Sequence, residues 1–143
     1  MAKTKYGHHI FTNFKPEELG GDGKRAKYTV VLDAKGGEKF KGKDFSIAAC
    51  LIKEPGIMVP DTHTHEFDQF LVFIGSNPLA ESLGGEAEIC LGKEQEKHVI
   101  KNKTIVHIPG GLEHCPLTHK KVGKPYLFLD IILASEYKSN LSK

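Results

Sequence analysis

The segment His63-Thr-His-Glu-Phe-Asp-Gln-Phe-Leu-Val-Phe-Ile-Gly75 combines a strand pattern with a spacing that suits metal binding. Side chains alternate along a strand, so His63, His65 and Gln69 point to one face. The strand continues into apolar residues on both faces, which predicts that it is buried. A buried polar group without a partner costs roughly 2–7 kcal/mol. A metal ion would satisfy both imidazoles at once; the alternative is a pair of solvated histidines at a strand end.

A second segment supplies a third histidine. It reads Thr104-Ile-Val-His-Ile-Pro-Gly-Gly-Leu-Glu-His114, a strand followed by a Pro-Gly-Gly turn. The turn redirects the chain and can bring His114 to a neighbouring strand. Three imidazoles together with Gln69 would form a divalent-metal site that keeps room for water or a substrate, as catalytic metal sites do.

The rest of the chain also predicts strands. Apolar and β-branched runs alternate with turns that contain glycine and proline, which is typical of an antiparallel sandwich or barrel. The expected strands cover residues 28–32, 45–52, 63–74, 87–91, 98–100, 104–108 and 126–133. Only residues 14–20 are expected to be helical, for one or two turns, because a proline and two acids precede a glycine.

In the two histidine segments the sequence resembles the cupin superfamily. The first cupin motif has the form G-x5-H-x-H-x3/4-E-x6-G; His63 and His65 match its histidine pair, and Gln69 stands at its glutamate. The second motif has the form G-x5-P-x-G-x2-H-x3-N, and residues 109–114 match its core. The resemblance covers about residues 56–118. The glutamine is the chief departure, and the second motif also lacks its first glycine and its final asparagine.

The resemblance implies a single all-β domain over residues 1–143, folded as a double-stranded β-helix, the jelly-roll barrel of cupins. The motif-bearing core would cover residues 56–118, with a short N-terminal extension at 1–27. Such a barrel implies a divalent metal ion, Zn, Fe, Mn or Ni. The residues that match the motifs would bind it: His63, His65, Gln69 and His114. The resemblance also implies a homodimer.

The expected ligand set indicates a chemistry. Three neutral imidazoles and a neutral amide would leave the charge of the metal uncompensated, which makes the metal a strong Lewis acid. We therefore expect an enzyme of lyase or isomerase type that acts on a small oxygen-rich carbonyl or carboxylate metabolite. Two alternatives stay open. One is a cupin that binds a small ligand or a structural metal without catalysis; the other is an iron-dependent dioxygenase, although the usual carboxylate ligand is missing.

The sequence identifies no catalytic acid or base. Glu113, His107 and Tyr6 are the candidates for lying near the site. Glu66 and Asp68 are expected on the face opposite to the histidines, because their positions have the other strand parity.

Composition narrows the function classes. The 143 residues are 39% hydrophobic and 27% charged, which is typical of a globular domain. The 20 Lys and Arg residues nearly balance the 18 Asp and Glu residues, so neither nucleic acid nor a membrane is expected as a partner. No apolar run reaches the roughly 18 residues of a membrane span. Three cysteines without a CxxC spacing indicate a cytoplasmic protein without disulfides.

Three further expectations concern the surroundings of the site. The long connection at residues 76–85 is expected to form a lip over the pocket. The C-terminal residues 135–143 are expected to fray. His119, in the polar run Thr-His-Lys-Lys, is expected to be solvated.

Overall fold

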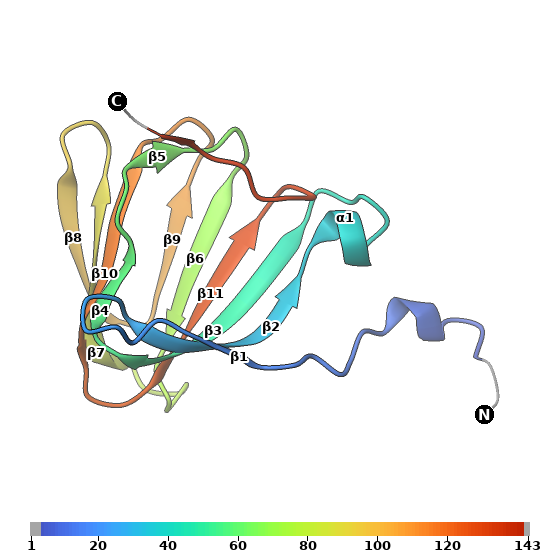
Figure 1. The fold of residues 1–143 in the computed structure, drawn as a ribbon, viewed down its shortest axis with the longest axis horizontal. Coiled ribbons are helices and arrows are strands. Elements are labelled where there is room, and N and C mark those ends of the chain that lie inside the picture. Colours follow the sequence, from blue (N-terminus) through green and yellow to red (C-terminus); the bar gives the residue numbers. More distant parts are fainter. Residues whose placement is uncertain (1–3, 142–143) are drawn as a thin grey trace.

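The computed structural model describes residues 4–141 as two six-stranded β-sheets that pack against each other (Figure 1). One sheet has the strand order β1-β2-β3-β11-β6-β9; the other has the order β12-β5-β10-β7-β8, with β4 paired to β10. The strands are β1 (Glu17–Leu19), β2 (Lys27–Ala34), β3 (Ser46–Glu54), β4 (Gly56–Val59), β5 (His63–Thr64), β6 (Gln69–Ile74), β7 (Ser82–Leu91), β8 (Glu96–Asn102), β9 (Thr104–Ile108), β10 (His114–Val122), β11 (Tyr126–Ile132) and β12 (Asn140–Leu141).

Helix is confined to two short turns within the described residues: α1 (Gly36–Lys39) and a 3-10 turn at Gly7–His9. The neighbouring strands named above pair in antiparallel fashion throughout. The all-β, double-stranded barrel predicted from the sequence is therefore confirmed. Across residues 4–141, no helix has both the length and the apolar character that crossing a membrane requires.

Residues 14–20 do not form the predicted helix. Glu17–Leu19 form β1 instead, an edge strand paired with residues 28–30 of β2. A helix of one or two turns is marginal in water, and pairing to β2 satisfies the same backbone groups at lower cost. The chain before β1, residues 4–16, runs away from the barrel and is called the N-terminal arm below (Figure 1).

Strand alternation fills the space between the sheets. In β6, Gln69, Leu71 and Phe73 are buried, and the residues between them are partly exposed. Phe73 packs against Phe128 of β11, with ring centroids 5.1 Å apart. Ile89 of β7 belongs to the same core and closes it from the second sheet. Burial of a side chain of this size contributes about 1.5–3 kcal/mol, so these rows fix the register of the strands.

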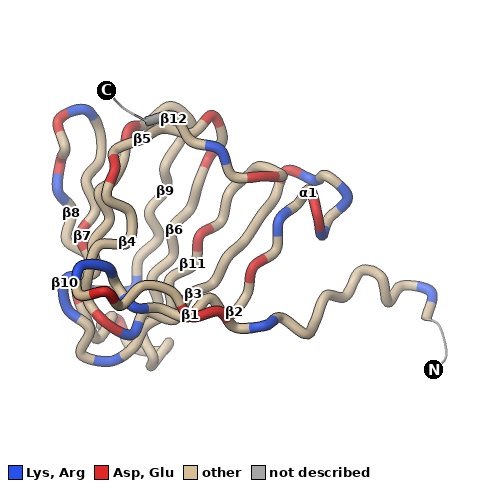
Figure 2. Tube along the Cα trace, in the orientation of Figure 1, with Lys and Arg blue, Asp and Glu red and all other residues tan. Residues whose placement is uncertain are grey.

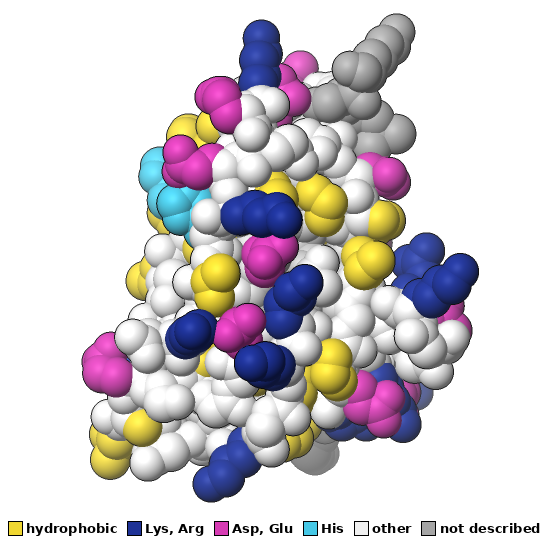
Figure 3. All heavy atoms as spheres, turned by 90° about the vertical axis from the view of Figure 1, so that its left-hand side faces the viewer, with side chains coloured by type: hydrophobic (Ala, Val, Ile, Leu, Met, Phe, Trp, Pro, Cys, Tyr) yellow, Lys and Arg dark blue, Asp and Glu magenta, His cyan; other side chains and the backbone are white. Residues whose placement is uncertain are grey.

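The outer surfaces of the two sheets differ in charge. The face that carries β7, β8 and β10 is dotted with Lys, Arg, Asp and Glu side chains (Figure 3). In the other sheet, β3, β11, β6 and β9 carry few charges (Figure 2), and the Asp130 position of β11 has inward parity with the buried Phe128 and Ile132. Apart from Lys53 and His107, the partly or fully exposed positions with outward parity in these strands are apolar: Ile47, Ala49, Leu51, Phe70, Val72, Ile74, Ile105, Leu127, Leu129 and Ile131. We call these ten residues the apolar outer face.

The connection between β6 and β7 does not form the predicted lip. β6 begins at Gln69 and ends at Ile74, at the other end of the barrel from β5 (Figure 1). The connection therefore turns at that far end, where the Gly84 carbonyl accepts hydrogen bonds from the backbone nitrogens of Gly123 and Lys124. The prediction was wrong because length alone does not say at which end of a barrel a loop lies.

His119 is buried, contrary to the sequence prediction. It has no exposed surface. Its Nδ1 lies 2.6 Å from the Tyr126 hydroxyl, and its Nε2 lies 3.3 Å from the Met58 sulfur. β10 keeps its alternation through this polar run, so Leu117 and His119 point inward while Thr118 is partly exposed. Burial lowers the pKa of His119 to about 4.

We expect His119 to make stability depend on pH. In the unfolded chain a histidine takes up its proton below about pH 6.5, whereas folded His119 resists protonation until about pH 4. The unfolded state therefore binds more protons between these values, and the free energy of unfolding should fall as the pH drops through this window, by up to about 3 kcal/mol. Urea unfolding in the presence of a chelator should show a shallower pH slope for His119→Gln. The matched change at the exposed His98 should leave the slope as it is; equal slopes for wild type and His119→Gln would contradict the assignment.

Candidate metal centre

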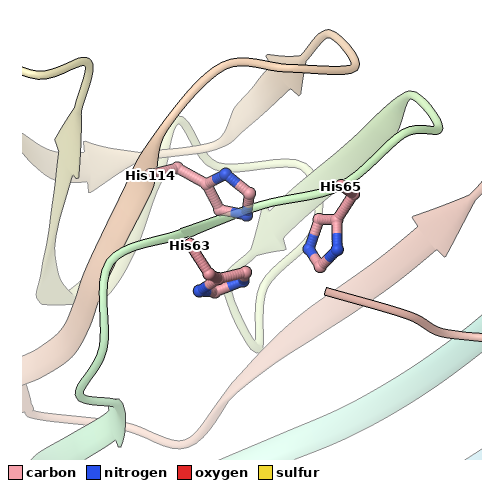
Figure 4. Close-up of side chains that lie close together, drawn as sticks. All are labelled: His63, His65 and His114. Atoms are coloured by element: carbon pink, nitrogen blue, oxygen red, sulfur yellow. The ribbon is translucent and has the colours of Figure 1, made fainter. Parts of the chain in front are cut away.

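The three predicted histidines meet at one end of the barrel. His63 lies in β5, His65 follows directly after it, and His114 begins β10, where it pairs in register with His63. All three side chains are buried. One ring nitrogen from each lies within 4.8 Å of those of the other two. Figure 4 shows the three rings converging from two neighbouring segments of the chain.

The other ring nitrogens of these histidines decide which atoms could bind a metal. Nδ1 of His63, His65 and His114 lies 2.7, 2.6 and 2.9 Å from the backbone carbonyl oxygens of Asp61, Lys138 and Leu112. A carbonyl oxygen only accepts, so each Nδ1 carries the proton and donates. Each Nε2 then keeps its lone pair, which is the arrangement found around metal-bound histidines.

Two of these Nε2 atoms are buried and unpaired within the described residues. The Nε2 atoms of His65 and His114 are buried and have no hydrogen-bond partner within residues 4–141. Burial lowers the pKa of His114 to about 4 and lowers that of His65, and the neighbouring imidazoles act in the same direction. The rings of His65 and His114 therefore favour the neutral form, the one that binds a metal. Buried lone pairs that converge without a partner fit a divalent cation.

Gln69 lies beside this cluster and has an unusual neighbour. Its Nε2 donates a 2.7 Å hydrogen bond to Oδ1 of Asp130, and its Oε1 is buried without a partner. Because a carboxylate accepts, this bond fixes which end of the amide faces Asp130. The amide oxygen thus points elsewhere, and Gln69 lines the same cavity as His63 and His114. Coordination of the metal by Gln69 stays a prediction.

Sequence reasoning missed Asp130. Burial raises the pKa of this carboxyl, while the hydrogen bond from Gln69 opposes the rise. The signal was present in the run Tyr-Leu-Phe-Leu-Asp-Ile-Ile of β11, since Asp130 shares the inward parity of Phe128 and Ile132. An acid at an inward position of an apolar strand is expensive to bury and therefore indicates a function.

The cavity at the cluster is small and mostly apolar. Its volume is about 150 Å³, below the roughly 300–1,000 Å³ typical of sites for drug-sized ligands. Besides the two histidines and Gln69, it is lined by Tyr28, Met58, Val59, Leu71, Cys115, Leu117, Phe128, Asp130 and Tyr137. A ligand of only a few heavy atoms fits such a space.

Other candidates from the sequence lie away from the cavity. Asp68 and His107 pair on the outside, with 2.9 Å between Oδ2 and Nε2, and the His107 ring stacks on Phe70. Tyr6 is exposed in the N-terminal arm. The prediction that His107 and Tyr6 lie near the site was therefore wrong, because the side chain of His107 points outward from β9 and the N-terminal arm runs away from the barrel. Glu66 is exposed and does not line the cavity. Glu113 stays a prediction.

Comparison with solved structures places the fold. The chain resembles a variant of oxalate decarboxylase from Bacillus subtilis, at 12% identity and a TM-score of 0.56, over 94% of this chain and 33% of that one. It resembles the polyketide cyclase RemF from Streptomyces resistomycificus, at 14% identity and a TM-score of 0.58, over 100% of this chain and 86% of that one. It also resembles Peruvianin-I, a cysteine peptidase from Thevetia peruviana latex, at 14% identity and a TM-score of 0.63, over 97% of this chain and 80% of that one.

These likenesses define a class by fold. The chain has the cupin fold, with a cluster of three histidines that could bind a metal. It spans about a third of the length of the oxalate decarboxylase chain. No protein-family model matches the sequence, and no curated protein matches it.

The contact between Gln69 and Asp130 predicts how a negative charge would act at the site. In the single variant Gln69→Glu, the new carboxyl group would lie against that of Asp130 and be repelled by it. The additional change Asp130→Asn would remove this repulsion, because an asparagine side chain can donate a hydrogen bond to the carboxylate. Coulomb attraction at ~4 Å with an effective dielectric of ~20 is about 4 kcal/mol before desolvation. The double variant Gln69→Glu/Asp130→Asn should therefore bind zinc at least about tenfold more tightly than Asp130→Asn, as measured by competition with a chelator. Equal affinities would mean that the oxygen of residue 69 does not face the histidines.

Proposed function

We propose that this protein binds one divalent metal ion through Nε2 of His63, His65 and His114, and acts with it on a small carbonyl or carboxylate metabolite. One observation carries the proposal: three buried imidazoles donate Nδ1–H to backbone carbonyls, and one ring nitrogen from each lies within 4.8 Å of those of the other two. Nε2 of His65 and Nε2 of His114 have no hydrogen-bond partner in the described part of the chain. A protein interior leaves such lone pairs unpaired only at a cost, and a metal ion removes it.

The bound metal would supply a Lewis acid whose charge no carboxylate ligand neutralises. The residues of the chain have complementary tasks. Apolar side chains such as Leu71 and Phe128 line the cavity and lower its polarity, which strengthens electrostatic interactions inside it. Gln69 presents an amide oxygen that can accept a hydrogen bond from a ligand. Asp130 carries the only carboxyl group among the residues that line this cavity, so we assign it as the group that takes or gives a proton.

The metal site is tested by elemental analysis of protein purified without a chelator. We expect about one divalent metal ion per chain, with loss of metal in His114→Ala. Affinity for added zinc should fall at least about 100-fold, because one of three ligands is gone. His107→Ala is the matched control, since this histidine lies on the outside and should not matter. Full metal content in His114→Ala would place any metal elsewhere.

Catalysis is tested separately. A panel of small carbonyl and carboxylate metabolites is incubated with protein loaded with Zn, Fe, Mn or Ni. Turnover should disappear in His114→Ala and fall about 100-fold or more in Asp130→Asn, which should keep its metal. A protein that holds metal but turns over nothing in the panel would be a non-catalytic binder of small ligands.

We also propose that the protein is a homodimer joined through the apolar outer face. Antiparallel sheets with one face in water show polar residues there, whereas β3, β6, β9 and β11 expose apolar ones. Ile105 is 67% exposed at the start of β9. An apolar face whose few polar groups are already paired, His107 with Asp68 and Lys53 with Glu18, is complementary to itself, which suits a two-fold pairing of identical copies.

The area of this face indicates that the N-terminal arm takes part. Four strands spaced ~4.8 Å apart and about 20 Å long cover roughly 400 Å², about half of the ~800 Å² that each partner buries in a standard interface. The arm holds Tyr6 and Ile10, which are 64% and 72% exposed. An arm that reaches onto the second copy would supply the missing area.

Sedimentation at micromolar concentration should give about twice the chain mass of 15.8 kDa. Val72→Glu, in the middle of the apolar outer face, should shift the mass to that of one chain, because a buried unpaired carboxylate is costly. Val99→Glu, on the exposed side of β8 in the charged sheet, is the matched control and should stay dimeric. A wild-type mass near that of one chain would contradict the dimer.

A further inference from the structure

The chain after β11 is part of the site rather than a frayed end. Residues 134–141, which we call the C-terminal strap, cross the end of the barrel and return to β5 (Figures 1 and 2). The strap is held at its start by hydrogen bonds from Ser46 Oγ to the Ala134 carbonyl and from Gly37 N to the Ser135 carbonyl. At its end, β12 pairs with β5. The prediction that residues 135–143 fray was therefore wrong as far as residue 141; the last two lie outside the described residues.

The strap contacts two of the three histidines. The Lys138 carbonyl accepts the 2.6 Å hydrogen bond from Nδ1 of His65. The Tyr137 hydroxyl lies 3.4 Å from Nε2 of His63, and the Tyr137 ring meets the His65 ring edge-on with centroids 4.8 Å apart. Tyr137 also lines the cavity, although 48% of the residue is exposed.

The Tyr137 hydroxyl occupies a position that suits a metal ligand. It lies near Nε2 of His63, the atom expected to bind the metal. A separation of 3.4 Å is long for an O–H···N hydrogen bond, which favours less than about 3.2 Å. It is close to the separation of two donor atoms on one tetrahedral metal, about 3.3–3.4 Å for bonds of ~2.0–2.1 Å. The distance of the phenol oxygen from Nε2 of His63 thus suits a second ligand atom of the same metal.

We infer that Tyr137 supplies a fourth donor to the metal, which a substrate would join as a fifth ligand, and that metal binding and docking of the strap stabilise each other. The inference rests on the proposed metal site. Lys138 acts through His65, since its carbonyl holds the ring with Nε2 turned inward. Linkage is reciprocal: if the docked strap favours the metal, the metal favours the docked strap by the same factor.

Limited proteolysis of the full chain measures the docking. Trypsin cleaves after Lys138, whose side chain is largely exposed, only when the strap leaves the barrel. Saturating zinc should slow this cleavage at least tenfold in wild type. Cleavage after the exposed Lys5 in the N-terminal arm is the internal control and should not respond to zinc. In His114→Ala, zinc should no longer protect Lys138.

Tyr137→Phe tests the hydroxyl itself, because it keeps the ring that packs on His65. Zinc affinity should fall about tenfold or more, and the visible tyrosinate charge-transfer band expected of protein loaded with Fe³⁺ or Cu²⁺ should be absent. Tyr6→Phe, exposed in the N-terminal arm, is the matched control and should keep both.

The outcomes separate the two proposals. Wild type that binds no metal overturns the metal site itself. Wild type that binds zinc, but with Lys138 cleaved at the same rate and Tyr137→Phe binding equally well, leaves the site standing and overturns the role of the strap.

Discussion

Three hydrogen bonds from imidazole Nδ1–H to backbone carbonyls hold the candidate metal centre in its geometry. Their acceptors are the carbonyls of Asp61, Lys138 and Leu112. Each bond fixes the tautomer of its histidine and the rotation of its ring, so that a lone pair faces the centre of the cluster. Because the acceptors are main-chain atoms, the geometry depends on how the strands end rather than on further side chains. The fold itself sets the chemistry of these rings.

The cluster of His63, His65, His114 and Gln69 contains no carboxyl group, but an acidic side chain is hydrogen-bonded to Gln69. Where the cupin motif has a glutamate, this chain has Gln69, and the Asp130 carboxyl is bonded to the far side of the amide. An acid in that place orients the amide of Gln69. The acid also lines the same cavity as His63 and His114, so it acts on the site without standing at the glutamate position of the motif. The chain thus differs from the family pattern in charge but keeps an oxygen-bearing group at the same position.

The sequence predicted the histidines and the barrel well because both follow from short-range patterns. His63 and His65 share strand parity, and the Pro-Gly-Gly turn before His114 sets the direction of the chain. The failures are of another kind. His119 stands in a polar run but keeps the inward parity of β10. Lys138 contributes its backbone carbonyl, which accepts the hydrogen bond from His65. A pattern of side chains in the sequence does not indicate which main-chain carbonyl will act as an acceptor.

The reach of the strap has a consequence for how the protein folds. His65 and its acceptor Lys138 lie 73 positions apart in sequence, so their contact closes one of the long loops of the chain, at an entropic cost that favours its forming after contacts between nearer residues. A partly folded chain offers a metal only flexible imidazoles whose tautomers are not yet chosen. The complete set of donors exists in the finished tertiary structure alone. Metal occupancy would thus report on the completion of folding, because only completely folded molecules would bind the ion tightly and be stabilised by it.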